Sequence, residues 1–188
     1  METTISLLKN HARRIGSEVN YKEIPYPPTP PTNETYHRRY LYFKYGSAFF
    51  VCYADSKELG PQGVFSGVFK ILDVPSSFNA EFRKRDILDK LNVFQSKSGF
   101  KSGIPSFDSK VRIKTNDKAL LKRFLQERNM QNLILVGLNS GDAMLIGINM
   151  LDMGFVAELK GKAFIGVYTQ MTWIEDTNMI EKLFKILD

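Results

Sequence analysis

The chain has 188 residues and a formal net charge of +6 at neutral pH, with 43% hydrophobic and 12% aromatic residues. This composition is typical of a globular protein with a real core and excludes a disordered chain. Cys52 is the only cysteine, so an intramolecular disulfide is impossible and a secreted disulfide-bonded scaffold is excluded.

The first residues lack the order of a signal peptide, which is a basic region, a long apolar run and a small-residue cleavage site. No apolar run approaches the roughly 20 residues that a helix needs to cross a bilayer. We therefore expect a soluble, cytoplasmic protein without a transmembrane segment.

The N-terminal third of the chain predicts a helix followed by strands. Residues 4–15 place their apolar side chains on one helical stripe. Residues 21–32 hold five of the eight prolines, which predicts an extended, polyproline-like connector, or a ligand for an SH3-like groove. The aromatic, β-favouring segments 38–45 and 48–54 predict a hairpin, and a third strand is expected around 64–74.

The middle of the chain is less regular. Residues 78–94 fit no clean pattern, although Ile87, Leu88 and Leu91 can anchor a short helix. Residues 96–106 repeat Lys-Ser-Gly, which indicates a loop, and any subdivision of the chain is expected there.

The remaining segments carry clearer periodicity. Residues 110–114 alternate as a half-buried strand does, and Asn116 is expected to cap a central helix over about 116–128. Two hairpins are expected to follow. A C-terminal helix over about 176–187 is predicted by an i, i+3, i+4, i+7 apolar stripe. The hairpins join 133–138 to 143–149, and 155–159 to 163–169.

These elements together predict the fold class. The order of helices and hairpins, without long crossovers, favours an α+β fold with a mainly antiparallel sheet. The N-terminal, central and C-terminal helices are expected to pack on that sheet. We expect residues 1–188 to form a single compact domain.

No pattern in the sequence supports a catalytic, cofactor or metal site. Cys52 lies in an apolar strand segment, where a thiolate is disfavoured. His11 and His37 lie next to arginines and have no second His or Cys at ligand spacing. No glycine-rich phosphate loop is present. We assign no catalytic residue, cofactor or metal ligand.

The positive charge is concentrated in one part of the sequence. Residues 61–130 hold 14 Lys/Arg against 7 Asp/Glu, a balance of +7, whereas residues 131–188 hold 4 against 7, a balance of −3. Such an asymmetry favours a surface that attracts an anionic partner. Basic residues on exposed strands also suppress edge-to-edge aggregation, which is a purely structural explanation.

Three functional hypotheses follow. The first is a non-enzymatic interaction domain that binds a protein partner through a basic surface within residues 61–130. The second is nucleic-acid binding through the basic and aromatic hairpin, where bases stack on tyrosines. The third is an enzyme with an unrecognised site. The candidate partner-binding residues are Arg38, Arg39, Tyr40, Tyr42, Lys44, Arg83, Lys84, Arg85, Lys97 and Lys101.

Overall fold

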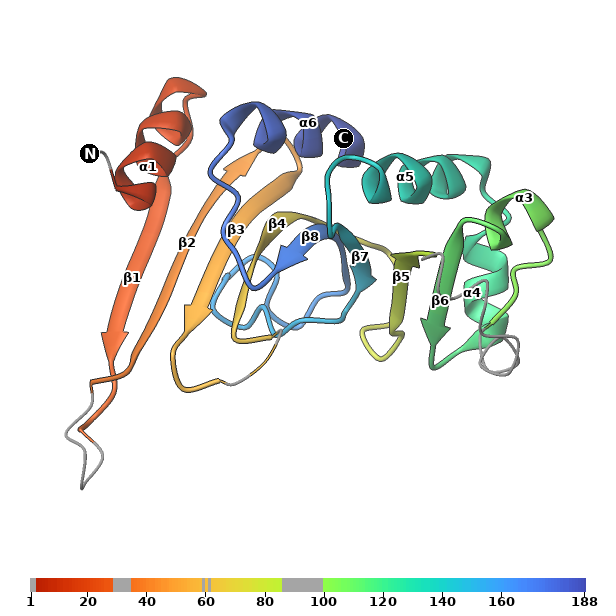
Figure 1. The fold of residues 1–188 in the computed structure, drawn as a ribbon, viewed down its shortest axis with the longest axis horizontal. Coiled ribbons are helices and arrows are strands. Elements are labelled where there is room, and N and C mark those ends of the chain that lie inside the picture. Colours follow the sequence, from red (N-terminus) through yellow and green to blue (C-terminus); the bar gives the residue numbers. More distant parts are fainter. Residues whose placement is uncertain (1–2, 29–34, 59, 61, 86–99) are drawn as a thin grey trace. The chain divides into compact units, whose positions relative to one another are not determined.

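The computed structural model describes residues 3–28, 35–58, 60, 62–85 and 100–188 (Figure 1). Its helices are α1 (Thr4–Arg14), α3 (Pro105–Asp108), α4 (Lys118–Phe124), α5 (Arg128–Leu138) and α6 (Thr177–Leu187). Its strands are β1 (Val19–Pro25), β2 (His37–Tyr45), β3 (Ala48–Asp55), β4 (Val64–Ile71), β5 (Ala80–Lys84), β6 (Val111–Thr115), β7 (Leu145–Ile148) and β8 (Phe164–Gln170).

The chain divides into two compact units. Unit 1 comprises Met1–Lys70 with Tyr168–Asp188, and unit 2 comprises Ile71–Val167. The strand order is β1-β2-β3-β4-β8-β7-β5-β6, and β8 contributes its last residues to unit 1 and its first residues to unit 2. Whether the chain behaves as one domain, or subdivides near 96–106, stays a prediction.

Unit 1 is built on the antiparallel strands β1 to β4, and α1 and α6 cover one face of them (Figure 1). Phe43 on β2 contacts both helices, because its ring centroid lies 6.0 Å from that of His11 and 6.2 Å from that of Phe184. Each helix begins at a capping side chain. Thr3 accepts from the backbone N–H of Ser6, and Asp176 accepts from that of Asn178.

Unit 2 has β5 between β7 and β6, paired antiparallel with both. Helix α5 approaches β7 closely at Gly137, where an added Cβ would lie 2.8 Å from Cδ1 of Ile146. Ile146 is opposite Phe82 on β5, and Phe82 is opposite Ile113 on β6. These side chains are buried, so this face of the strands is the one that α5 covers.

The α+β class, the mainly antiparallel sheet and the three expected helices are confirmed. The first hairpin is also confirmed as β2 and β3. The N-cap of the central helix is Asp117 instead of Asn116, because the Asp117 side chain accepts from the backbone N–H of Leu120. Residues 21–25 belong to β1, which is the first strand in the order and therefore tolerates Pro25 at its end.

Two expected strands are wrong. Residues 133–138 belong to helix α5, whose buried residues Ile134, Gly137 and Leu138 follow helical spacing. Residues 155–159 form turns, in which Leu159 donates to the carbonyl of Val156. Both expected hairpins therefore fail, although their second segments contain β7 and β8.

The ambiguous segment 78–94 contains strand β5. Helix α3 begins at Pro105, within the expected loop 96–106, and residues 96–99 of that loop lie outside the described residues. The short helix considered around Ile87, Leu88 and Leu91 lies outside the described residues. In the part of the chain that the structure describes, no helix is long and apolar enough to cross a membrane.

Candidate functional site

Strands β5 and β6 gather basic side chains on one of their two faces. Side chains two residues apart on a strand point to the same face, and directly opposite residues of an antiparallel pair share that face. Arg83 lies opposite Arg112, and Glu81 lies opposite Lys114. The backbone N–H of Arg85 donates to the carbonyl of Lys110, which continues the same register. We call this set the basic face: Glu81, Arg83, Arg85, Lys110, Arg112 and Lys114.

The basic face is the face opposite α5. Phe82 and Ile113 alternate with the members of the basic face along the two strands. Their side chains are buried on the other face. The basic face holds five basic side chains and one carboxylate, which is a balance of +4. Arg83, Lys110 and Lys114 are exposed, and Arg85 and Arg112 are half-buried. The excess charge of the middle third is therefore partly collected on one surface.

Glu81 organises one of these cations. Its side chain is 10% exposed, and it accepts hydrogen bonds from both Nε and Nη2 of Arg83, the second over 3.2 Å. A bidentate pair of this kind fixes the plane of the guanidinium. Nε of Arg85 is buried and has no hydrogen-bond partner within the described part of the chain. Arg83 belongs to β5, which is an inner strand, and Arg85 directly follows it.

The other predicted residues of unit 2 do not belong to the basic face. Lys84 is opposite Val111, so it extends toward the helix-covered side at the end of β5. Lys101 is exposed ahead of α3. Lys97 lies outside the described residues.

The predicted residues of the hairpin lie in unit 1, where Arg38, Tyr40, Tyr42 and Lys44 share one face of β2 and Arg39 lies on the other. Tyr40, Tyr42 and Lys44 alternate with Leu41 and Phe43 along β2, and both tyrosines are half-buried. Lys44 places its Nζ 5.6 Å from the ring centroid of Phe49. Arg39 is exposed and points to the opposite face, which Leu41 and Phe43 share.

Arg38 is held by a buried carboxylate. Its Nε lies 3.0 Å from Oδ2 of Asp55, and its Nη2 donates to the hydroxyl of Tyr26 over 2.8 Å. The Tyr26 hydroxyl in turn donates to the same carboxylate oxygen. This network joins the ends of β1, β2 and β3. Its residues are occupied with one another, which makes Arg38 a structural residue.

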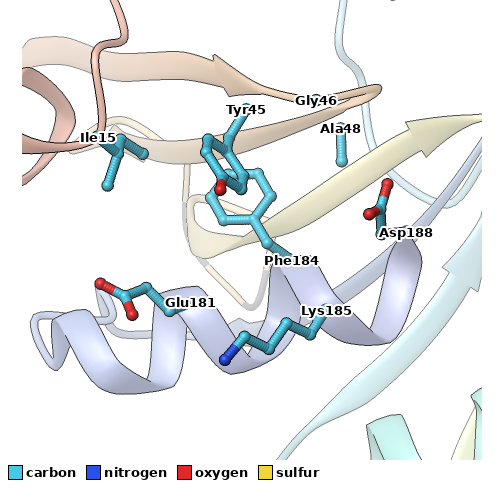
Figure 2. Close-up of a pocket in the computed structure, with 8 residues that line it drawn as sticks. All are labelled: Ile15, Tyr45, Gly46, Ala48, Glu181, Phe184, Lys185 and Asp188. Atoms are coloured by element: carbon cyan, nitrogen blue, oxygen red, sulfur yellow. The ribbon is translucent and has the colours of Figure 1, made fainter.

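A pocket of about 300 Å³ lies in unit 1 between the β2–β3 turn and α6 (Figure 2). Tyr45 and Phe184 meet edge to face in it, with ring centroids 5.4 Å apart, and Ile15 completes the apolar part. Glu181, Lys185 and Asp188 form a charged rim. The pocket is at the small end of the range for ligand sites, and its lining pairs no Ser, Thr or Cys nucleophile with a base. It supports no catalytic assignment.

The surroundings of Cys52, His11 and His37 give none of these residues a catalytic role. Burial raises the pKa of the Cys52 thiol well above its ordinary value, which disfavours a thiolate. His11 is buried against Phe43, and His37 lies 3.5 Å from Glu23. Among the residues described, no group of three or more His, Cys, Asp or Glu side chains could hold a metal ion.

Comparisons with known proteins assign no family to this arrangement. No protein-family model, curated protein or solved structure shows a significant match to the chain.

Four of the six residues of the basic face were not among the predicted site residues, namely Glu81, Lys110, Arg112 and Lys114. The alternation of basic and apolar residues over 110–114 indicated one charged strand face. The partner strand was hidden, because residues 80–84 were not recognised as a strand and strand pairing leaves no signal in a single sequence.

Proposed function

We propose that the protein is a non-enzymatic interaction module that binds an acidic protein partner through the basic face. The observation that supports it most strongly is the gathering of five basic side chains and one carboxylate on the basic face, a balance of +4. Arg83 already pairs with Glu81, so the exposed Lys110 and Lys114 are the cations that this face offers most directly to an acidic partner.

Protection of a sheet edge explains only part of the basic face. Edge strands are protected by charged residues on the edge itself. Lys110, Arg112 and Lys114 belong to β6 or precede it, and β6 is the last strand in the order. Arg83 belongs to the inner strand β5, which is already paired on both sides, and Arg85 directly follows that strand. Their position favours a binding role.

The composition of the basic face favours protein over nucleic acid. Proteins that bind single-stranded nucleic acid add aromatic side chains on which bases stack. The six residues of the basic face include no aromatic residue, and the β7 residues opposite Glu81 and Arg83 are Gly147 and Leu145. The hairpin that supplies tyrosines is in the other unit, and its Arg38 is paired with Asp55.

A matched pair of charge reversals tests the proposal. Lys110→Glu with Lys114→Glu removes exposed charge from the basic face. Lys118→Glu with Lys122→Glu makes the same charge change on exposed positions of α4, in the same unit. Partners captured from extract of the source cells by the wild-type protein should be lost with the first double variant and kept with the second. Equal capture by all three proteins would contradict the proposal.

Nucleic-acid binding is the alternative outcome. Fluorescence anisotropy with labelled single- and double-stranded DNA and RNA separates it, at low and at near-physiological salt. Binding that persists at physiological salt and weakens on Tyr40→Ala or Tyr42→Ala would overturn the protein-partner proposal. Binding that disappears with modest salt is the expected result, because exposed cations attract any polyanion at low ionic strength.

A further inference from the structure

Strand β1 is an edge strand with an exposed outer side. It is the first strand in the order, and within the described part of the chain it pairs with β2 alone (Figure 1). In an antiparallel pair, residues whose backbone groups bond the neighbour alternate with residues whose groups point away. The N–H of Tyr26 donates to the carbonyl of Tyr36 over 2.8 Å, which fixes the alternation. Asn20, Lys22 and Ile24 therefore direct their backbone groups toward β2.

The backbone groups of Val19, Tyr21 and Glu23 consequently point away from β2. Among the residues that the structure describes, none hydrogen-bonds these groups from the outer side. Val19 and Tyr21 are half-buried and Glu23 is exposed, so another chain can reach this edge. Such a row of donors and acceptors is a template for another strand.

The residue types that protect sheet edges leave this row intact. Lysine and proline on an edge discourage strand addition. Lys22, however, belongs to the set whose backbone groups bond β2. Pro25 lacks an N–H donor, but it is the last residue of the strand. Pro25 therefore limits the free row to three residues without removing it.

We infer that a second copy of the chain adds its own β1, antiparallel, to this edge and forms a symmetric dimer. Strand addition obtains its affinity from main-chain hydrogen bonds. One register uses all three free residues, namely the register in which Tyr21 lies opposite Tyr21 of the second copy. Val19 then lies opposite Glu23 of the second copy. A shift by two residues in one direction sets Lys22 opposite Lys22, which is unfavourable, and in the other direction leaves Glu23 beyond the strand of the second copy.

Charge and closure favour a second copy as the occupant. The net charge of +6 opposes self-association in general, but β1 holds one lysine and one glutamate and is neutral. At the other end of the strand order, Val111 and Ile113 of β6 are 2% and 1% exposed, so that edge is covered. Pairing through β1 therefore closes at two copies and does not grow into a fibre. The edge is in unit 1 and the basic face is in unit 2, so this inference is independent of the proposed function.

Hydrogen exchange of the full chain at two concentrations tests the pairing residue by residue. One pair of short strands buries little area and predicts a dissociation constant of about 100 micromolar, so the concentrations are about 10 micromolar and about 1 millimolar. The amides of Val19, Tyr21 and Glu23 should exchange about fourfold more slowly at the higher concentration, because they become paired. The three intervening amides already bond β2 and should be the slower set at the lower concentration. Unchanged exchange of the outer amides overturns the inference.

A matched pair of substitutions at Val19 tests the register. Val19→Glu sets like charges opposite each other at two symmetric places, whereas Val19→Lys sets a cation opposite Glu23 of the second copy. Sedimentation equilibrium should give a dissociation constant about tenfold higher for Val19→Glu than for Val19→Lys. The change in net charge acts in the opposite direction, and both variants lose the same side chain. Circular dichroism checks that both are folded. Equal constants overturn this register.

The remaining outcomes separate this inference from the proposed function. A chain that stays monomeric at about 1 millimolar overturns the dimer. Lys110→Glu with Lys114→Glu should leave the dissociation constant of the dimer within about threefold of wild type, because these residues are in the other unit. Loss of the dimer in that double variant would place the interface away from β1 and overturn the inference. Capture of the acidic partner should be the same for Val19→Glu as for wild type, whether or not the dimer forms.

Discussion

Arg38 donates from its Nε to Oδ2 of Asp55 over 3.0 Å, and this ion pair joins the start of β2 to the end of β3. The Asp55 side chain is 1% exposed, so the carboxylate depends on its hydrogen bonds in place of water. Tyr26 donates to it through its hydroxyl, and Lys57 through its backbone N–H over 2.9 Å. A cation fixed in this way contributes to stability.

Asp55→Asn should therefore lower the free energy of unfolding by about 2 kcal/mol. The substitution keeps the size of the side chain but replaces one acceptor with a donor that faces Arg38 and Tyr26. Urea denaturation followed by circular dichroism measures the difference. Arg39→Ala, at the exposed neighbouring position, should change stability by less than about 0.5 kcal/mol. Equal effects of the two substitutions would remove Asp55 from the stabilising network.

The same pair predicts a dependence on pH. Burial alone raises the pKa of Asp55, but hydrogen bonds from Tyr26, Lys57 and Arg38 outweigh it and leave the pKa below its ordinary value of 3.8. Its contribution is thus complete above the unfolded-state pKa and is lost as pH falls through the folded-state pKa. The stability gap between wild type and Asp55→Asn should be constant near neutral pH and should close below about pH 4. A gap that widens on acidification would contradict this assignment.

His11 predicts a second pH effect at milder acidity. Burial, and then the charge of Arg14, lower the pKa of His11 below its ordinary value of 6.5 despite the opposing charge of Glu181. The unfolded chain therefore takes up a proton that the folded chain does not, and stability falls as pH drops below about 6.5. His11→Phe should remove this loss, because it keeps a ring against Phe43 without a titrating group.

Urea titrations of wild type and His11→Phe at several pH values between 7 and 5 make this comparison. His37→Gln, a substitution of the other histidine, is the control, and the loss of stability below about pH 6.5 should remain because His11 is still buried against Phe43. If wild type and His11→Phe lose stability in parallel over this range, another group is responsible.

The sequence predicted those parts of the fold in which one periodicity is unambiguous. The stripe of α6 and the aromatic alternation of β2 each repeat over several turns or residues. The apolar run of α5 is too short for its period to decide between helix and strand, and its exposed Val136 favours strand by propensity. Tertiary packing favours the helix over the strand, because Gly137 lets the helix approach Ile146 and Val167.

The basic face, like helix α5, could not be predicted from the sequence, because it depends on contacts between distant residues. Arg83 and Arg112 are 29 positions apart (112 − 83) and become neighbours only through the pairing of β5 with β6. Charge counting located the segment but also included Lys84, which points to the other side. Register alone separates these residues, since a shift by one position moves every side chain to the opposite face.

Cys52 should be protected from thiol reagents in the native protein. It is fully buried in the inner strand β3, and burial raises the pKa of its thiol. Because the thiolate is the reactive form, modification requires local or global opening of unit 1. Reaction with a disulfide reagent should be at least about a hundredfold slower in native buffer than in denaturant. Rapid stoichiometric labelling of the native protein would contradict the burial of this strand.

Gly137→Val should destabilise unit 2 by about 2 kcal/mol, because even a Cβ at this position would lie 2.8 Å from Ile146 and 3.2 Å from Val167. Val136→Ala is the matched control, since Val136 is 52% exposed on the same helix. Circular dichroism during urea denaturation reports the whole chain. A loss of stability with Val136→Ala as large as that with Gly137→Val would show that α5 is sensitive to any substitution, and that the close contact at Gly137 is not the cause.

The same variant tests whether the two units unfold together. Trp173, the single tryptophan, lies in unit 1, where its indole N–H donates to the carbonyl of Tyr53 over 2.9 Å. Its fluorescence therefore reports unit 1, whereas Gly137 is in unit 2. For a single cooperative domain, Gly137→Val should shift the fluorescence and circular dichroism midpoints by the same amount. A shift in circular dichroism with an unchanged fluorescence midpoint would mean that the units unfold independently and that the expectation of one domain is wrong.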